Sequence, residues 1–446
     1  MRTGPEIVVV LGLLLAAGHA GAAGSGGDAW QGEAEESGNS DPFAGFDDED
    51  WDDPWAARGG GLSWSGFVEG GLGARWNSVD NLDRLTLGDV RVRAETRYDH
   101  GAFRVDFKGD LLWDEVVEDL DAQLRELAAS FSPASNVDMK LGRQVLTWGT
   151  GDLLFLNDLF PKDFISFFAG RDEDYLKSPS DTARVSGFTG PVNIDLAYTP
   201  RFTPDDYLYG ERFAFWNPAL GEVAAPARPR RAEEPTNGEL ALRLFRTVGA
   251  TEYAIYGYRG RWKQPVGVDD AGMPRFPRLQ SWGASMRMPL HKGLFNTEAA
   301  YYDSRDDRSG DDPRTPNSEF RLLAGYEQEL VRNLTAGTQL YAERIMHHDR
   351  LVANSIDPDR ERDRWRTVTT LRLTYRALQD TLTSSLFVFV SPSDEDFYLR
   401  PSIAWRRDDH WLLAAGLNLF GGSDEHTFFG QLEDNSNGWL RLRYNY

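Results

Sequence analysis

Arginine and lysine residues at alternating positions are the feature of this sequence that points most directly to chemistry. In one segment Val90 and Val92 point to one side of an extended chain, and Arg91, Arg93 and Arg97 point to the other. Cations arranged in this way around a water-filled space favour anions. We predict that the residues of this kind form a basic strip that lines a pore: Arg91, Arg93, Arg97, Arg104, Lys108, Arg364, Arg366, Arg372, Arg376, Arg400 and Arg406.

The same cations have a second interpretation. Acidic residues occupy the same predicted face, among them Glu95, Asp106, Asp110, Glu298, Glu327 and Glu343. Ion pairs between the two sets would hold the structure together and leave little positive charge for a solute. The sequence leaves both interpretations open.

Catalysis and metal binding have weak support. The chain has no cysteine, which excludes disulfides, thiolate metal sites and a cysteine nucleophile, and it has only seven histidines. No Gly-x-Ser-x-Gly elbow occurs, and nothing among the 70 acidic residues selects the carboxylate pair of a glycosidase. The net charge of -22 argues against nucleic-acid binding. We therefore predict no enzyme, no cofactor and no metal site.

The elements that must position the basic strip are β-strands. Period-two alternation recurs from residue 62 onward, for example over 89–98 and 397–406, and it predicts about 16–18 strands, many about 10 residues long or longer. That length suits a tilted strand that crosses a bilayer. Short turns alternate with longer polar loops, such as 201–236 and 348–362. This arrangement is typical of an all-β fold, the transmembrane antiparallel β-barrel.

Two further features favour the barrel over a soluble propeller or sandwich. The last strand places Leu440, Leu442, Tyr444 and Tyr446 on one face, which resembles the terminal strand that outer-membrane proteins present to their assembly machinery. Aromatic residues near strand ends suit the rim of a membrane interface: Trp76, Tyr98, Trp113, Trp262, Trp282, Tyr301, Trp365, Tyr375, Trp405 and Trp411. In such a barrel the basic strip must face the lumen, because Lys or Arg facing lipid costs about 2–4 kcal/mol at mid-bilayer.

Segment 142–185 carries the remaining candidate site. The segment has too many apolar residues between Leu153 and Phe168 for an exposed loop. It also has too many strand-breaking residues to form a single strand. We predict that residues about 149–180 fold against the inner wall and narrow the lumen. The alternative is a periplasmic plug or turn whose aspartates cap and bend the backbone. The charged residues predicted at the constriction are Arg143, Asp152, Asp158, Asp163, Arg171 and Asp172.

The same segment resembles a known family. It contains Gly142-Arg143-Gln144, Trp148-Gly149, Asn157-Asp158 and Pro161-Lys162-Asp163, and Phe428-Phe429-Gly430-Gln431 precedes the last strand. This pattern is similar to a motif of Gram-negative outer-membrane porin-like barrels allied to alginate-export proteins. The resemblance implies a monomeric barrel that passes a solute, and it does not identify the solute.

The first 60 residues predict export and a disordered tether. Arg2, the apolar run 7–17 and Ala20-Gly21-Ala22 are the three parts of a secretory signal, so we predict a signal peptide over residues 1–22. Residues 23–60 are acidic and Gly-rich, and self-repulsion keeps such a segment unfolded. Aromatic residues among the acids allow 28–55 to dock on a periplasmic partner, but we favour the interpretation of a solvated tether.

Together these features predict a channel in the outer membrane of the Gram-negative cell envelope. It would pass polar or anionic solutes by diffusion. Its partners would be outer-membrane lipid and lipopolysaccharide, and the barrel assembly machinery would bind its C-terminal strand. The alternative is a partner-dependent conduit or export component that is tethered through the acidic N-terminal segment.

Overall fold

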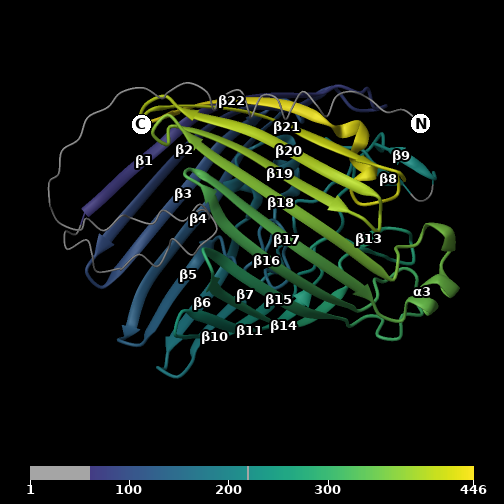
Figure 1. Cartoon of the computed structure of the whole chain (residues 1–446), viewed down its shortest axis with the longest axis horizontal. Helices are drawn as coiled ribbons and strands as arrows, with labels where there is room; N and C mark the ends of the chain where they lie inside the picture. The colour runs from purple at the N-terminus through teal and green to yellow at the C-terminus, as the bar shows by residue number, and fades with distance from the viewer. Residues whose placement is uncertain (1–60, 218–219) are drawn as a thin grey trace. The chain divides into compact units, whose positions relative to one another are not determined.

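A closed ring of strands forms the molecule. The computed structural model describes residues 61–217 and 220–446; the predicted signal peptide and acidic tether lie outside the described residues. The ring is one antiparallel sheet of 18 strands, in which β1 pairs with both β2 and β22 (Figure 1). The prediction of an all-β barrel is confirmed. The wall strands, in ring order, are β1 (Gly61–Arg75), β2 (Leu85–His100), β3 (Phe103–Asp114), β4 (Asp119–Ala134), β5 (Val137–Gln144), β6 (Ser180–Phe188), β7 (Asn193–Thr199), β10 (Glu239–Val248), β11 (Thr251–Arg261), β14 (Arg278–Leu290), β15 (Gly293–Ser304), β16 (Glu319–Val331), β17 (Leu334–Ile345), β18 (Trp365–Ala377), β19 (Leu382–Ser391), β20 (Asp396–Arg406), β21 (Trp411–Gly422) and β22 (Asn437–Asn445).

The wall strands bury one set of alternating side chains and expose the other. In β1 and β2, Glu69 and Arg91 are buried inside the ring, whereas Val68 and Val92 are 41% and 40% exposed outside it. A sheet in hydrocarbon must close on itself, because its backbone N–H and C=O groups find no water there. The closed ring and its apolar outer face are those of a membrane-spanning barrel.

Aromatic residues predicted at the rim are mostly exposed on the outer face. Trp113, Trp282 and Trp365 belong to this group. Trp262 does not, because it is buried and its ring stacks on that of Tyr302 with centroids 5.6 Å apart. Trp262 directly follows β11 and continues the inward-facing set of Tyr256 and Tyr258. Its prediction as a rim residue was therefore wrong.

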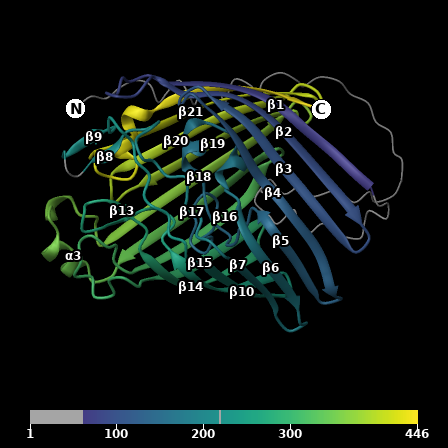
Figure 2. The same cartoon turned by 180° about the vertical axis from the view of Figure 1, so that it is seen from behind.

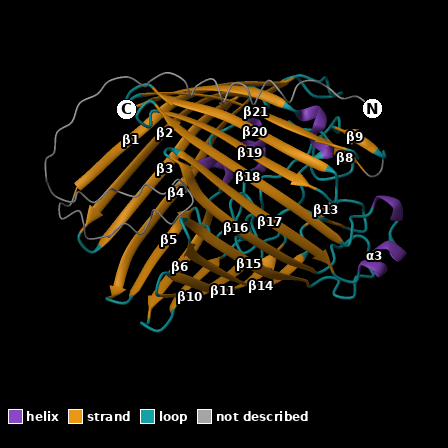
Figure 3. Ribbon diagram, viewed as in Figure 1, coloured by secondary structure: helices purple, strands orange, loops and turns teal. Residues whose placement is uncertain are grey.

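The connections differ in length at the two ends of the barrel. Short turns join β2 to β3 and β16 to β17, whereas the long segments 145–179, 200–238, 262–277 and 346–364 lie at the other end (Figure 3). The view from behind shows α3 and the β8–β9 hairpin at that same end (Figure 2). Within the described ranges, no helix combines the length and apolar character needed to cross a membrane. The small elements of the long segments are α2 (Phe164–Ala169), η3 (Glu173–Leu176), β8 (Phe215–Asn217), β9 (Glu222–Ala224), β12 (Gly267–Val268), β13 (Pro274–Arg275), α3 (His348–Asn354), η4 (Pro358–Arg360) and η5 (Gly430–Asn435).

The outward position of Val92 near the middle of β2 leads to a stability prediction. We expect Val92→Arg to lower the free energy of unfolding by about 2–4 kcal/mol, because the guanidinium would face hydrocarbon. Urea titrations of the protein in lipid vesicles would measure this value. Val92→Ala is the control, since it shortens the side chain without adding charge. Equal effects of the two substitutions would contradict the lipid-facing assignment.

Candidate functional site

Segment 145–179 lies inside the ring of strands and crosses the lumen. Tyr302 of β15 donates a hydrogen bond to the carbonyl of Leu156 at 2.5 Å, and Arg93 of β2 donates one to the hydroxyl of Tyr175 at 2.7 Å. In the ring of 18, β15 and β2 are nine strands apart. The two contacts therefore come from opposite walls.

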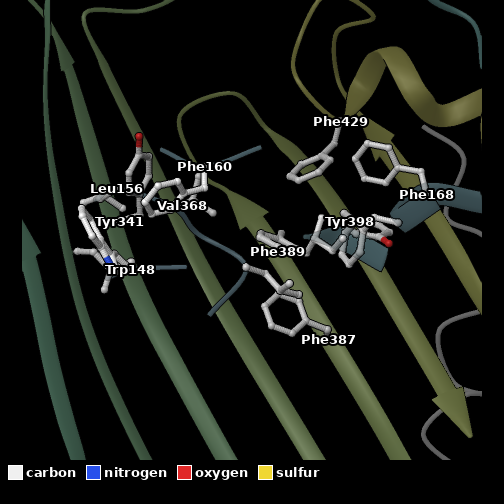
Figure 4. Close-up of a cluster of buried hydrophobic side chains, with 14 of the residues drawn as sticks. Trp148, Leu156, Phe160, Phe168, Tyr341, Val368, Phe387, Phe389, Tyr398 and Phe429 are labelled. Atoms are coloured by element: carbon white, nitrogen blue, oxygen red, sulfur yellow. The ribbon is translucent and has the colours of Figure 1, made fainter. Parts of the chain in front are cut away.

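The apolar side chains of this segment form a core inside the lumen. Leu156, Phe160 and Phe168 are buried with Phe389 and Tyr398 of the wall (Figure 4). The rings of Phe168 and Tyr398 meet edge to face with centroids 5.8 Å apart, a geometry that aromatic pairs favour. This burial explains the apolar run that marked the segment in the sequence.

One wall carboxylate holds the start of the segment. Glu298 of β15 is buried and accepts hydrogen bonds from the backbone N–H of Thr150, the backbone N–H of Gly151 at 2.9 Å and Nδ2 of Asn157 at 2.6 Å. Gly149 has a φ of 92°, and a Cβ there would lie 3.0 Å from the Glu298 carboxylate. A glycine is thus needed beside this carboxylate. Glu298 thus binds amide groups of the inserted segment, whereas the second interpretation of the sequence paired it with the basic strip.

The tip of the segment is acidic and binds arginines of the wall. Asp172, which precedes η3, accepts hydrogen bonds from Arg441 at 3.0 Å and Arg443 at 2.9 Å, both on β22. Burial alone would raise the pKa of the Asp172 carboxyl, but attraction to the two arginines outweighs it and brings the pKa below its usual range. Asp172 is therefore ionised at neutral pH.

Two more carboxylates of the segment bind β18 and β20. Glu173 in η3 pairs with Arg400 of β20, and its other oxygen lies 3.6 Å from Nη1 of Arg372. Arg372 of β18 also donates to both oxygens of Asp152, at 2.6 and 2.9 Å. A bidentate pair of this kind fixes the planar guanidinium in one orientation. Arg372 therefore links two separate parts of the segment.

Tyr175 completes the contact between η3 and the wall. Its ring centroid lies 4.0 Å from Cζ of Arg91 on β2 and 4.7 Å from Cζ of Arg125 on β4. Its hydroxyl donates to Asp110 of β3 at 3.0 Å. Through these contacts η3 and the preceding Asp172 bind strands from β18, across the β22–β1 closure, to β4. We call this half of the wall, with Arg91, Arg93, Arg125, Arg372, Arg400, Arg441 and Arg443 facing η3, the arginine arc.

The predicted basic strip lies largely on the same half of the wall, and most of its members take part in ion pairs. Arg364 does not belong to the wall, because it precedes β18 on a long segment, where it is exposed and pairs with Asp349. Arg376 and Arg406 lie near the short-turn ends of β18 and β20. The ion pairs of the other members are Arg91 and Arg93 with Asp110, Arg97 with Asp106, Arg104 with Asp99, Lys108 with Glu95, Arg366 with Asp394, Arg372 with Asp152, and Arg400 with Glu173.

The six charged residues predicted at the constriction do not form one group. Asp152 and Asp172 bind the arginine arc, as described above. Asp158 instead pairs with Lys162 at 2.9 Å, and Asp163 caps α2 by accepting the N–H of Ser166 at 2.7 Å. Arg171 pairs with Asp89 at 2.6 Å and Asp114 at 2.7 Å, toward the long-segment end of β2 and β3.

Arg143 lies apart from the lumen contacts. It shares the strand face of Leu141, which is exposed, and pairs with Asp181 at 3.3 Å across the β5–β6 ladder. The period of two places Arg143 on the outer face, whereas the neighbouring Gln144 is buried. Our placement of Arg143 at the constriction does not agree with this geometry.

The sequence analysis did not identify several residues that form the contact between η3 and the arginine arc. Arg441 and Arg443 alternate with Leu440 and Leu442, so the same period-two signal could have identified them. Tyr175 and Arg125 carry no such signal. Their meeting depends on the path that the segment takes across the lumen.

The comparisons with known proteins identify the fold. No family model and no curated protein matches the sequence. Among solved structures, OccK2 (OpdF) of Pseudomonas aeruginosa in complex with glucuronate has a TM-score of 0.52 at 10% identity, over 86% of this chain and 97% of that one. OccK5 (OpdH) of the same organism gives 0.51 at 12% over 86% and 97%, and OccAB3 of Acinetobacter baumannii gives 0.50 at 10% over 86% and 99%. The fold is that of outer-membrane channel barrels. At these identities the likeness concerns the fold alone.

The pairing of Glu173 with two arginines leads to a prediction about ion selectivity. We expect Glu173→Gln to raise the ratio of chloride to potassium permeability roughly two- to fivefold, since removing one unit charge near a water-filled path changes the energy of an ion by about 0.4–1 kcal/mol. Reversal potentials in a KCl gradient across a planar bilayer would measure the ratio. Glu222→Gln, at an exposed position of β9, is the matched control. A ratio that stays constant would show that η3 lies away from the ion path.

Asp205 of segment 200–238 is a second carboxylate that holds the inserted segment in place. Asp205 is buried and accepts the backbone N–H of Lys162 at 2.8 Å. Burial raises the pKa of Asp205 to about 6, against the partial compensation of that hydrogen bond and of the nearby lysines. The folded protein therefore holds this proton more tightly than the unfolded chain does.

This shift predicts a pH dependence of stability. Because the folded pKa is the higher one, the free energy of unfolding should fall as pH rises from about 4 to about 6, by up to about 3 kcal/mol. Asp205→Asn should remove this component, since the amide oxygen still accepts the N–H of Lys162 and carries no charge. Urea titrations in detergent at pH 4 to 7 would measure it, with Asp359→Asn on η4 as control. An unchanged pH profile in Asp205→Asn would contradict the assignment.

Proposed function

We propose that the protein is an outer-membrane channel through which small polar solutes diffuse, with a preference for anions. The observation that carries this proposal is the arginine arc: guanidinium groups on β18, β20 and β22 bind carboxylates of the inserted segment at hydrogen-bond distance. A wall that binds these carboxylates has the chemistry to bind a carboxylate in transit.

The position of the basic strip supports a path along one half of the wall. Arg97 and Lys108 are partly exposed toward the short-turn end, and Arg376 and Arg406 lie near that end of β18 and β20. Together with the arginine arc they extend the cations along the strands. A solute anion would then pass from one guanidinium to the next, which lowers the cost of leaving water.

The comparisons support the same proposal at the level of fold. OccK2 (OpdF) was solved in complex with glucuronate, a carboxylated sugar. We extend that solute class to this chain because its lumen holds arginine–carboxylate pairs. Kinship with alginate-export proteins, docking of residues 28–55 on a periplasmic partner, and recognition of the last strand by the assembly machinery stay predictions.

Planar-bilayer recordings of the refolded protein test the proposal. We expect a chloride to potassium permeability ratio above about two in a KCl gradient. Glucuronate should reduce the chloride current in a concentration-dependent way, and glucose at the same concentration should leave it unchanged, since it has a similar size and no charge. A preference for potassium, or equal effects of the two sugars, would contradict the anion preference.

A further inference from the structure

The helix α2 separates two cavities at the long-segment end of the barrel. Phe164 and Phe167 line one cavity of about 630 Å³, and Asp163 and Arg171, on either side of the same short helix, line another of about 580 Å³. The two cavities share no lining residue. The larger one therefore has its own chemistry, distinct from that of the charged neighbour.

The larger cavity is aromatic. Twelve of its 34 lining residues carry an aromatic ring, about a third, whereas aromatic residues make up 12% of the chain. Phe168, Phe389, Tyr398 and Phe429 form one side of it and are grouped together in Figure 4. The centroid of Phe429 lies 5.5 Å from those of Phe389 and Tyr398. We call this space the aromatic cavity; its volume is in the range of small-molecule sites.

The charges that line the aromatic cavity cancel one another. It has five cationic and five acidic lining residues, and each cation is held in an ion pair. The lining of the cavity therefore carries no formal net charge that would attract an anionic solute. The pairs are Lys162–Asp158 at 2.9 Å, Lys263–Glu239 at 2.7 Å, Arg321–Glu319 at 2.5 Å, Arg362–Glu319 at 2.9 Å and Arg366–Asp394 at 2.8 Å.

Two buried polar atoms of lining residues lack a hydrogen-bond partner. They are the indole Nε1 of Trp262, a donor, and Oδ1 of Asn317, an acceptor. Nδ2 of Asn317 donates to the carbonyl of Met346 at 2.8 Å, which fixes the amide so that Oδ1 is the free end. An unpaired buried group costs about 1–3 kcal/mol. A hydroxyl group, which both accepts and donates, can satisfy such atoms.

We propose that the aromatic cavity binds neutral aromatic compounds that carry a hydroxyl group, the phenols as a class. The ring would pack on the phenylalanine side of the cavity, and the hydroxyl oxygen would accept the indole N–H of Trp262. This site is separate from the arginine arc. Its occupation does not depend on whether the barrel conducts anions.

The test uses 4-fluorophenol as the probe and the full chain in detergent micelles. The ¹⁹F signal of the probe is followed by NMR as protein is added, because partition into micelles is the same for every variant and does not saturate. Val266→Trp places bulk at the edge of the cavity, where Val266 is 46% exposed. Val268→Trp is the matched control, since Val268 is also exposed but does not line the cavity.

We expect saturable binding that Val266→Trp weakens at least about tenfold and Val268→Trp changes by less than about twofold. Trp262→Phe keeps a ring and removes the N–H, so it should weaken 4-fluorophenol but not fluorobenzene, and it serves if Val266→Trp fails to fold. 4-Fluorobenzoate at neutral pH should bind at least about tenfold more weakly. Non-saturable binding, equal binding in Val266→Trp, or tighter binding of the benzoate would overturn the proposal. The KCl reversal potential of Val266→Trp should equal that of the unsubstituted protein, which separates this result from the anion preference.

Discussion

The closure of the sheet is the constraint on which the rest of this structure depends. In hydrocarbon every backbone N–H and C=O must find a partner within the protein, and pairing β1 with β22 leaves no free edge. Closure with 18 strands produces a ring too wide for wall side chains to fill. The outward side chains must be apolar, so the polar residues of each strand are directed to the interior.

The interior of the barrel must therefore accommodate charged side chains that the core of a soluble protein does not contain in such number. Many arginines point into a limited volume, and a buried charge without a partner costs several kcal/mol. Wall acids of β3 neutralise arginines of β2: Asp110 pairs with Arg91, and Asp106 pairs with Arg97. The inserted segment supplies carboxylates to β18, β20 and β22, and its phenylalanines turn part of the lumen into an ordinary apolar core.

The sequence contained most of the information about the wall and little about what fills it. Strand number, the apolar outer face and the alternation of turns and loops all follow from a period of two, which is a local property. The same period misplaced Trp262 only because we assigned it to the wrong face of the strand. Arg143 was placed at the constriction for a different reason: its proximity in sequence to the inserted segment was given more weight than its strand face.

The partners of the inserted segment could not be derived in this way. Asp152 and Asp172 were expected near the constriction, but nothing local to them selects Arg372 or Arg441, which lie more than 200 residues away in the chain. Asp158 and Asp163 of the same segment instead bind Lys162 and the start of α2. The partner of each charged residue is therefore set by the three-dimensional path of the chain, because the packing of the phenylalanines determines which opposite charges lie nearby.

The contact of η3 with both sides of the seam has a consequence for how the molecule is built. Tyr175 contacts arginines of β2 and β4, among the first wall strands, and Asp172 contacts β22, which follows the other wall strands in the sequence. The inserted segment cannot satisfy all of its charges until the first and last strands have met. Its complete set of contacts therefore requires the closed barrel, and a barrel that stays open would keep those carboxylates in water.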